Sequence, residues 1–387
     1  MNPEQTGIVE LRDLPKKEVF VSLKKNFHKK LENKIKNYGI FKFCRKLNMG
    51  NRIICHWLSD GSLIRLDVLN KILSFFSYKL AGKINFIRGK EGGCIYNPKL
   101  PFNFKNKEGV RIIAGILGDG GIPTKKNSPF YSNSNEFQIK GFLNDLNTVL
   151  GNIDYSIREI KKKNTIVKIV SLSSLIQKIF LNIGLKKGKK VETNPKIPRF
   201  IFDLDESKIY EFLSQMFDDE GSVSLASRHL CIKLNIHSKF NRHNLIDGIK
   251  VLFNNLDIKI GVYKIKKNKD RDEWKIEVHR RNQIEKLYDL FKLRNAKKRQ
   301  KIKLLLNSYK QYHYPFGECR DIYLNSMQKF EEKNGYFTTE MLANDLNRNL
   351  GHIRNMVCKY KKEGIINTIE VYTSGNTHYF ARHKVVK

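Results

Sequence analysis

The spacing of hydrophobic residues changes its period at Gly221. Before this glycine, hydrophobic residues recur every three or four positions, which predicts an amphipathic helix. They are Ile209, Phe212, Leu213, Met216 and Phe217. After it, Leu230, Ile232, Leu234 and Ile236 alternate with polar or small residues. This period of two predicts a strand with one buried face.

Similar patterns occur on both sides of this segment. Strands are predicted at 153–157 and 274–278, and a shorter one where Phe137 and Ile139 alternate with Gln138 and Lys140. The remaining hydrophobic runs predict helices over four ranges. These are 140–150, 172–183, 240–254 and 281–291. The central part of the chain is therefore predicted to be α+β.

Two short runs resemble each other closely. Residues 112–120 read Ile-Ile-Ala-Gly-Ile-Leu-Gly-Asp-Gly, and residues 213–221 read Leu-Ser-Gln-Met-Phe-Asp-Asp-Glu-Gly. Each hydrophobic run ends in an acid, Asp119 or Glu220, that is followed at once by glycine. The acids are about 100 residues apart, which is the size of a small domain. This spacing suggests two copies of one supersecondary unit.

The position of the two acids needs a chemical reason. Glycine is the ordinary residue just after a helix, because it adopts left-handed backbone angles without steric cost. A carboxylate at a helix C-terminus, however, meets the negative end of the helix dipole. Its occurrence at both matched positions predicts a compensating cation. A hard divalent ion such as Mg²⁺ prefers oxygen ligands and would serve.

The two runs resemble the motif of the LAGLIDADG homing endonucleases, in the single-chain form with two repeats. Asp119-Gly120 and Glu220-Gly221 match its eighth and ninth positions. The third and seventh positions are usually small, because the two motif helices cross closely there. Ala114 and Gly118 fit, whereas Gln215 and Asp219 do not, so a looser or locally polar interface is expected. The sixth position, often Asp, is Leu117 in one copy and Asp218 in the other.

The resemblance covers about residues 101–312 and implies a fold and a chemistry. The fold would be two αββαββα repeats in a pseudo-two-fold arrangement, forming an internal pseudo-dimer within a monomer. Asp119 and Glu220 would hold Mg²⁺ (or Mn²⁺) and hydrolyse phosphodiester bonds in double-stranded DNA. By position, Lys190 and Lys298 are the basic residues expected to assist catalysis. Gln138 and Lys233 are expected to support the site.

The outward faces of the predicted strands are rich in polar residues that suit phosphates and base edges. The candidate DNA contacts in this region are Gln138, Lys140, Lys233, Asn235, His237, Lys275 and His279.

Composition favours a polyanionic partner. The chain has 73 Lys and Arg against 38 Asp and Glu, a formal net charge of +35 spread along its length. Nucleic acid is the leading partner and a membrane surface the alternative. Because no apolar stretch approaches ~18 residues and Met1 opens a polar segment, a soluble, intracellular protein is expected. A cytoplasmic location is expected, and an organelle is not excluded.

Several other site classes are disfavoured. The six cysteines form no C-x-x-C pair and no Cys/His cluster with zinc spacing, so zinc chemistry and a disulfide scaffold are not expected. No H-E-x-x-H motif, Walker loop or dinucleotide fingerprint occurs.

The two ends read as separate modules. Residues 1–100 are predicted to be a helical module and a linker, with short helices at 40–47, 51–57 and 66–76. The first two resemble a helix-turn-helix in which Arg52 and His56 would face DNA, although a plain helical hairpin fits equally. Glycines and prolines at 89–101 predict the linker.

Residues 316–387 are predicted to form a winged-helix-like module of helices followed by a two-stranded wing. Arg354 and Lys359 are its candidate DNA contacts. With repeats at 101–200 and 201–315, the chain is expected to have four parts. The function expected from the sequence is a site-specific, metal-dependent DNA endonuclease. The alternatives are a DNA-binding regulator that has lost cleavage and an RNA-binding helper of intron splicing.

Overall fold

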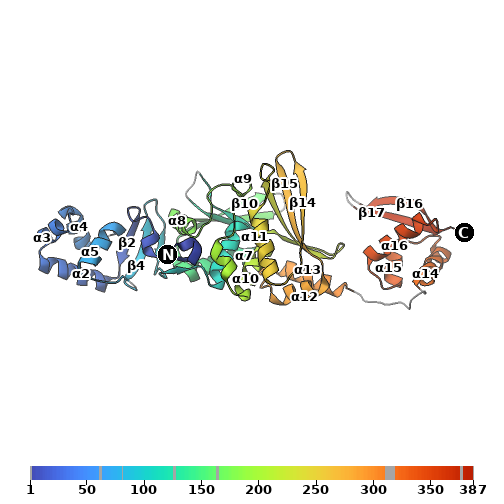
Figure 1. The fold of residues 1–387 in the computed structure, drawn as a ribbon, viewed down its shortest axis with the longest axis horizontal. Helices are drawn as coiled ribbons and strands as arrows, with labels where there is room; N and C mark the ends of the chain where they lie inside the picture. The colour runs from blue at the N-terminus through green and yellow to red at the C-terminus, as the bar shows by residue number, and fades with distance from the viewer. Residues whose placement is uncertain are drawn as a thin grey trace. The chain divides into compact units, whose positions relative to one another are not determined.

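The chain has an α+β architecture of helices and several small antiparallel sheets (Figure 1). A computed structural model describes residues 2–60, 63–80, 82–124, 128–162, 165–309, 319–374 and 378–386. Contacts divide the chain into two compact units. The first is Met1–Ser222, Cys231–Val278 and Asp289–Lys298, and the second is Val223–Leu230, His279–Tyr288 and Arg299–Lys387. The four-part division expected from the sequence stays a prediction.

The two motif runs form helices that pack against each other in the first unit. They are α6, Lys107–Leu117, and α10, Glu206–Glu220. Asn106 begins α6 by accepting a hydrogen bond from the Gly109 N–H, and Asp205 begins α10 in the same way with Lys208. From Gly109 onward α6 is buried, as its hydrophobic sequence requires.

Each motif helix is followed by two strands, a helix, two longer strands and a further helix, and the first series has one extra short strand, β9. After α6 come β7 Gly120–Gly121, β8 Phe130–Asn133, α7 Glu136–Leu150, β9 Asn152–Ile153, β10 Tyr155–Lys162, β11 Thr165–Leu172 and α8 Ser174–Asn182. After α10 come β12 Gly221–Ser224, β13 His229–His237, α11 Asn244–Asn255, β14 Gly261–Asn268, β15 Arg271–Val278 and α12 Arg281–Leu290. The four-stranded sheets have the orders β7-β8-β11-β10 and β12-β13-β15-β14. Both sheets thus place their last strand between the second and the third.

One predicted strand is wrong. The alternating residues at 137–140 form the first turn of α7, which begins at Glu136. Asn135 caps this helix by accepting a hydrogen bond from the Phe137 N–H. Four alternating residues are too few to distinguish the strand period of two from the helical period of 3.6 residues. The Asn135 cap extends the helix predicted at 140–150 toward the N-terminus.

The N-terminal region has the predicted short helices but is not purely helical. Its elements begin with α1 Pro3–Thr6, β1 Ile8–Val9, a 3-10 helix Leu11–Asp13 and β2 Val19–Leu23. They continue with α2 Lys25–Tyr38, α3 Ile40–Lys46, α4 Asn51–Asp60, β3 Ile64–Arg65, α5 Leu66–Phe75, β4 Ile84–Gly89, β5 Cys94–Tyr96 and β6 Phe102–Asn103. A five-stranded sheet has the order β3-β2-β4-β5-β9.

The linker predicted at 89–101 is also wrong in part. Its residues supply β5, which pairs with β4 on one side and with β9 on the other. Ile87 and Ile95 lie opposite each other and are fully buried, so this hairpin has a hydrophobic face. Gly92 and Gly93 take positive φ angles in its turn, which explains glycines that looked like a linker signal.

Three further elements belong to the central part of the chain. They are α9 Lys190–Thr193, a 3-10 helix Arg199–Asp203 and α13 Ala296–Asn307.

The C-terminal region follows the predicted order. Beyond α13 lie α14 Cys319–Asn334, α15 Thr339–Asp345, α16 Leu350–Lys362 and the antiparallel pair β16 Ile366–Ser374 and β17 His378–Val385. Residues 375–377, which separate the two strands of the predicted wing in the sequence, lie outside the described residues. The helices and the strand pair share one hydrophobic core, which includes Met327, Phe337, Leu342 and Ile353.

Among the described residues, no helix combines the length and the apolar character needed to cross a membrane.

Truncating Ile353 tests this C-terminal core. Ile353 on α16 is fully buried, so Ile353→Ala should lower local stability by about 2–5 kcal/mol through lost burial and the cavity left behind. Amide hydrogen exchange should accelerate in α16 and its neighbours but not in α6 or α10. Lys359→Ala, at an exposed position on the same helix, is the control. Unchanged protection in Ile353→Ala would contradict this core.

Candidate active site

The two motif acids lie at the C-terminal ends of adjacent helices. Asp119 follows the last turn of α6, and Glu220 is the last residue of α10. Burial, and then the charge of Glu220, raise the pKa of Asp119 to about 6, while Lys190 and Lys298 act in the opposite direction. Burial also raises the pKa of Glu220. The acids therefore share one electrostatic environment, although about 100 residues separate them in sequence.

A partly buried lysine binds the end of each motif helix. Lys190 Nζ donates to the Leu117 carbonyl at 3.1 Å and lies 4.0 Å from Glu220 Oε1. Lys298 Nζ donates to the carbonyls of Phe217 at 2.9 Å and Asp218 at 2.6 Å. Both lysines thus reach the sixth motif position, where the helix carbonyls lack intrahelical partners. Burial lowers the pKa of both lysines. They supply the cationic charge that the acids required.

Each of the two lysines lies at the beginning of a helix. Lys190 opens the short helix α9, and Lys298 lies in the first turn of α13. Asn295 caps α13, since its side-chain oxygen accepts from the Lys298 N–H at 3.2 Å. Asp218 in turn accepts the backbone N–H groups of Arg294 at 2.7 Å and Asn295 at 3.2 Å. The acid at the sixth motif position therefore anchors the segment that carries Lys298.

The two seventh motif positions are complementary. A Cβ atom on Gly118 would lie 2.5 Å from Asp219 Oδ2, so only glycine leaves room for this carboxylate. Asp219 Oδ1 accepts from the Tyr131 hydroxyl at 2.7 Å and from Gln215 Nε2 at 3.0 Å. Burial, and then the charge of Asp119, raise the pKa of Asp219 well above its ordinary value. The polar interface expected from Gln215 and Asp219 is present.

An ion-pair network extends from this interface to the neighbouring helix. Arg294 donates to Gln215 Oε1 at 3.3 Å and pairs with Asp145 on α7 at 2.6 Å. Arg111 on α6 binds the same carboxylate at 2.8 Å and Glu211 on α10 at 2.8 Å. The network therefore ties α6, α7 and α10 together behind the acids.

Asn133 is a site residue that the sequence did not reveal. From the end of β8, its Nδ2 donates to Asp119 Oδ2 at 2.8 Å. The neighbouring Ser132 hydroxyl donates to the Asp119 carbonyl at 3.0 Å. A polar residue at the end of a short strand was visible in the sequence, but its partner is set only by the fold.

The remaining predicted residues are not gathered at the acids. Gln138 is wrong as a DNA contact, because it is fully buried on α7, where it accepts a hydrogen bond from Gln215 at 3.3 Å. Lys140 is exposed on the same helix and pairs with Glu136. Lys233 and Asn235 are exposed on β13, between buried neighbours, as their alternation predicts.

The other candidates lie at partly or fully exposed positions. They are His237 at the end of β13, Lys275 on β15, His279 just after it, Arg52 and His56 on α4, and Arg354 and Lys359 on α16. Their contact with DNA stays a prediction.

The donor set fits a hard divalent cation. Asp119 and Glu220 offer carboxylate oxygens, which Mg²⁺ and Mn²⁺ prefer over nitrogen or sulfur. Burial, and then the charge of Glu220, raise the pKa of Asp119, and the two lysines offset this only in part. A bound cation would further favour the charged form of this carboxylate.

Comparison with known proteins finds similar chains among solved structures alone. No protein-family model and no curated protein matches the chain. Among solved structures, mesophilic variants of the homing endonuclease I-DmoI align over 49% of this chain and 97% of theirs, with 14% identity and a TM-score of 0.33. I-DmoI in complex with DNA and Mn aligns over 49% and 98%, with 15% identity and a TM-score of 0.35.

A second kind of protein has a similar score. Full-length DUF199/WhiA from Thermatoga maritima aligns over 68% of this chain and 93% of its own, with 17% identity and a TM-score of 0.37. At these low identities and scores, the function of this chain has to be argued from its own residues.

The raised pKa of Asp119 predicts how stability changes with pH. The folded protein holds this proton more tightly than the unfolded chain, so the Asp119 contribution favours folding at acidic pH and fades as pH rises from about 4 to 6. Between these values, without divalent cations, wild type should lose about 1–3 kcal/mol of unfolding free energy relative to Asp119→Asn.

Urea titrations at several pH values would measure this difference. Asp203→Asn removes an exposed carboxyl group outside the cluster and is the control. Parallel curves for wild type and Asp119→Asn would show that the pKa of Asp119 is not raised.

Proposed function

We propose that this protein is a site-specific, metal-dependent endonuclease that hydrolyses phosphodiester bonds in double-stranded DNA, of the LAGLIDADG type. The observation that carries the proposal is the pair Asp119 and Glu220, held at adjacent helix ends that each bind a partly buried lysine. The shared strand order of the two sheets supports a pseudo-two-fold pair of αββαββα repeats. A monomer would then carry both half-sites.

Asp119 and Glu220 would hold the divalent cations, Mg²⁺ or Mn²⁺. When bound, such a cation supplies Lewis-acid stabilisation and a reactive water for phosphodiester hydrolysis. Asn133 orients the Asp119 carboxylate, and Lys190 and Lys298 place positive charge beside it. Donors fixed in this way favour the extra negative charge of the transition state without reorganising during the reaction.

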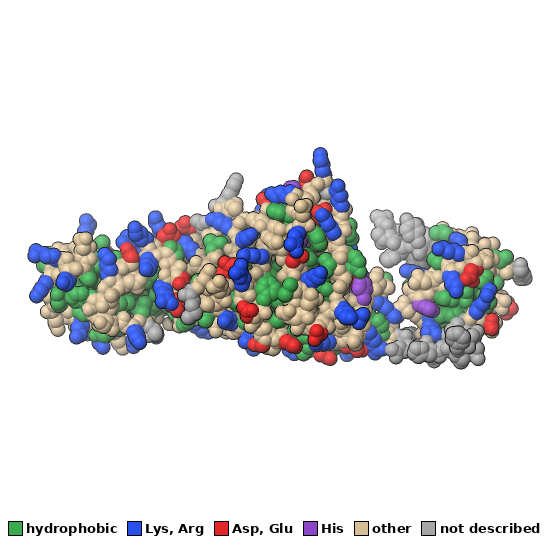
Figure 2. Space-filling model, viewed as in Figure 1, with side chains coloured by type: hydrophobic (Ala, Val, Ile, Leu, Met, Phe, Trp, Pro, Cys, Tyr) green, Lys and Arg blue, Asp and Glu red, His purple; other side chains and the backbone are tan. Residues whose placement is uncertain are grey.

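The surface chemistry suits a DNA partner. Lysine and arginine side chains are spread over the visible face and are not confined to one patch (Figure 2). The formal net charge of the chain is +35. Exposed Lys233 and Asn235 on β13 are the candidates for contacts in a DNA groove. Phosphate contacts of this kind give affinity, while cleavage depends on the acids.

Removing either acid should separate cleavage from binding. Asp119→Asn and Glu220→Gln should each lower double-strand cleavage by at least about 100-fold, because each removes a charged metal ligand. DNA affinity should stay nearly unchanged, since it rests on many phosphate contacts. Cleavable sites would first be selected from a random duplex library with Mg²⁺. Glu206→Gln, an exposed acid on the same helix as Glu220, is the matched control.

Three outcomes would change the proposal. Wild-type cleavage rates in either acid variant would remove the proposed site. A wild-type protein that binds one duplex tightly but never cuts it, with Mg²⁺ or Mn²⁺, would be a DNA-binding regulator. Preference for a folded RNA over every duplex would favour a role in RNA binding.

The C-terminal region offers a separate test of DNA binding. If Arg354 and Lys359 on α16 each contact a phosphate, Arg354→Gln and Lys359→Gln should each reduce the slope of log affinity against log salt by about 0.9. Titration of the full chain between low and moderate salt would measure the slope. Lys329→Gln changes an exposed lysine on α14 and is the control. Equal slopes in wild type and both α16 variants would exclude these contacts.

A further inference from the structure

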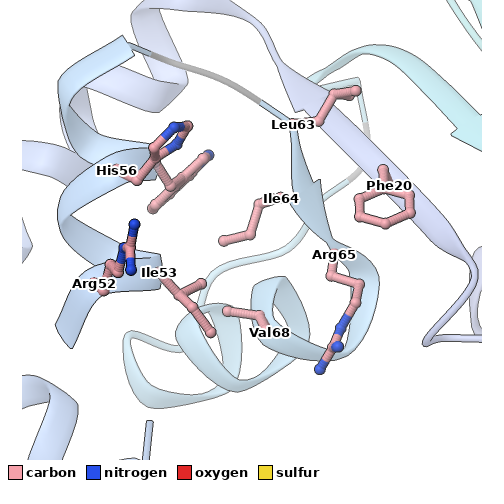
Figure 3. Close-up of a pocket in the computed structure, with 9 residues that line it drawn as sticks. Phe20, Arg52, Ile53, His56, Leu63, Ile64, Arg65 and Val68 are labelled. Atoms are coloured by element: carbon pink, nitrogen blue, oxygen red, sulfur yellow. The ribbon is translucent and has the colours of Figure 1, made fainter. Parts of the chain in front are cut away.

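The N-terminal region contains a pocket that the proposed cleavage site does not use. It lies between α4 and residues 63–68 of β3 and α5, and its volume is about 380 Å³. In Figure 3, Arg52, Ile53 and His56 from α4 stand on one side, and Leu63 and Phe20 stand on the other. A volume of this order is within the range of small-molecule pockets.

The walls of the pocket are mainly hydrophobic. Ile64 and Val68 are buried, whereas Ile53 remains 53% exposed at the opening. Phe20 adds an aromatic ring. An exposed isoleucine beside buried apolar side chains is a surface that gains from covering by a flat apolar group.

Two polar groups at the pocket have no partner within the described part of the chain. Trp57 lines the pocket and is only 2% exposed, yet its indole N–H makes no hydrogen bond there. The indole nitrogen itself is sealed from solvent, so Trp57 contributes an apolar surface to the floor of the pocket and no polar contact to a ligand. Arg52 is exposed, and no hydrogen bond or ion pair engages it among the described residues. Arg65, by contrast, is held by both oxygens of Asp67.

The surroundings of the pocket are strongly basic. Exposed lysines and arginines cover the neighbouring helices α2 to α4. They include Lys25, Lys29, Lys30, Lys34, Lys42, Arg45 and Lys46. Such a surface attracts a polyanion, and a flat, largely apolar part of a polyanion would suit both this surface and the pocket.

We propose that this pocket holds one unstacked nucleotide of a nucleic-acid strand. The base lies between Phe20, Ile53 and the buried floor, and Arg52 binds the adjacent phosphate. A nucleotide combines a flat ring with a charged phosphate, which matches the hydrophobic walls and the exposed guanidinium of Arg52. The inference rests on the proposed binding of nucleic acid, but not on cleavage.

The proposal changes the role expected for α4. In a helix-turn-helix, Arg52 and His56 would contact base edges in the major groove of an intact duplex. With the pocket occupied, α4 instead recognises a site where a base leaves the stack, such as a bulge, a strand end or a flipped nucleotide.

The test uses the full chain and two duplexes of the same sequence. One is fully paired, and the other carries a single unpaired 2-aminopurine, whose fluorescence reports its surroundings. Wild type should bind the second duplex about 5- to 150-fold more tightly, as one stacked base contributes about 1–3 kcal/mol. The fluorescence should change when the base enters the pocket.

Two variants and a matched control locate the effect. Ile53→Asp places a charge at the opening, and Arg52→Gln removes the phosphate partner; both positions are exposed, so folding should be kept. Each should reduce the preference for the unpaired base by at least about fivefold. Arg45→Gln removes an equal charge from α3 outside the pocket and should keep the preference.

Equal wild-type affinity for the two duplexes would overturn the proposal, as would a preference that survives both pocket variants. Competition by an aromatic, acidic peptide but not by the unpaired duplex would also overturn it, in favour of a protein partner. Cleavage of a selected duplex by the same preparation separates these outcomes from failure of the proposed function. A chain that cuts DNA but ignores the unpaired base fails only the pocket proposal.

Discussion

The crossing of α6 and α10 is the constraint on which the rest of the site depends. Two helices that end side by side bring two negative dipole ends together, and each adds a carboxylate. This concentration of negative charge would be unfavourable without Lys190 and Lys298, which bind the terminal carbonyls directly. The helix ends, the acids and the lysines therefore form one electrostatic unit rather than separate features.

The supports behind this unit are also charged and buried. Asp145 on α7 binds Arg111 of α6 and Arg294 of the segment before α13, and Arg111 also binds Glu211 of α10. Breaking a buried pair leaves an unpaired charge and costs more than the pair contributes, so such a network fixes geometry more than it adds stability. It keeps the ends of α6 and α10 at one relative position, which two half-sites acting on one duplex would require.

The sequence was informative where a short-range rule decides the outcome. The helix periods, the strand of β13 and the acids followed by glycine were all visible, because each depends on neighbours in the chain. The predictions failed where the pattern was too short or where the deciding partner lies far along the chain. The period at 137–140 was too short to outweigh the Asn135 cap, and the glycines at 92 and 93 mark a hairpin whose partner strand β9 lies far along the chain. Asn133 gained its role only when β8 met the end of α6.

The departures from the motif show why single positions mislead. Asp219 looks like the loss of a small residue, and Gly118 looks like an ordinary one. In the fold, the missing side chain of Gly118 is the space that the Asp219 carboxylate fills. A small residue in place of Asp219 would leave the buried Tyr131 hydroxyl and Gln215 amide without this acceptor, and a larger residue in place of Gly118 would displace the carboxylate. Gly118 and Asp219 are thus complementary across the interface. The polar residue at 219 is accommodated because the interface provides both the space and the hydrogen-bond donors that it needs.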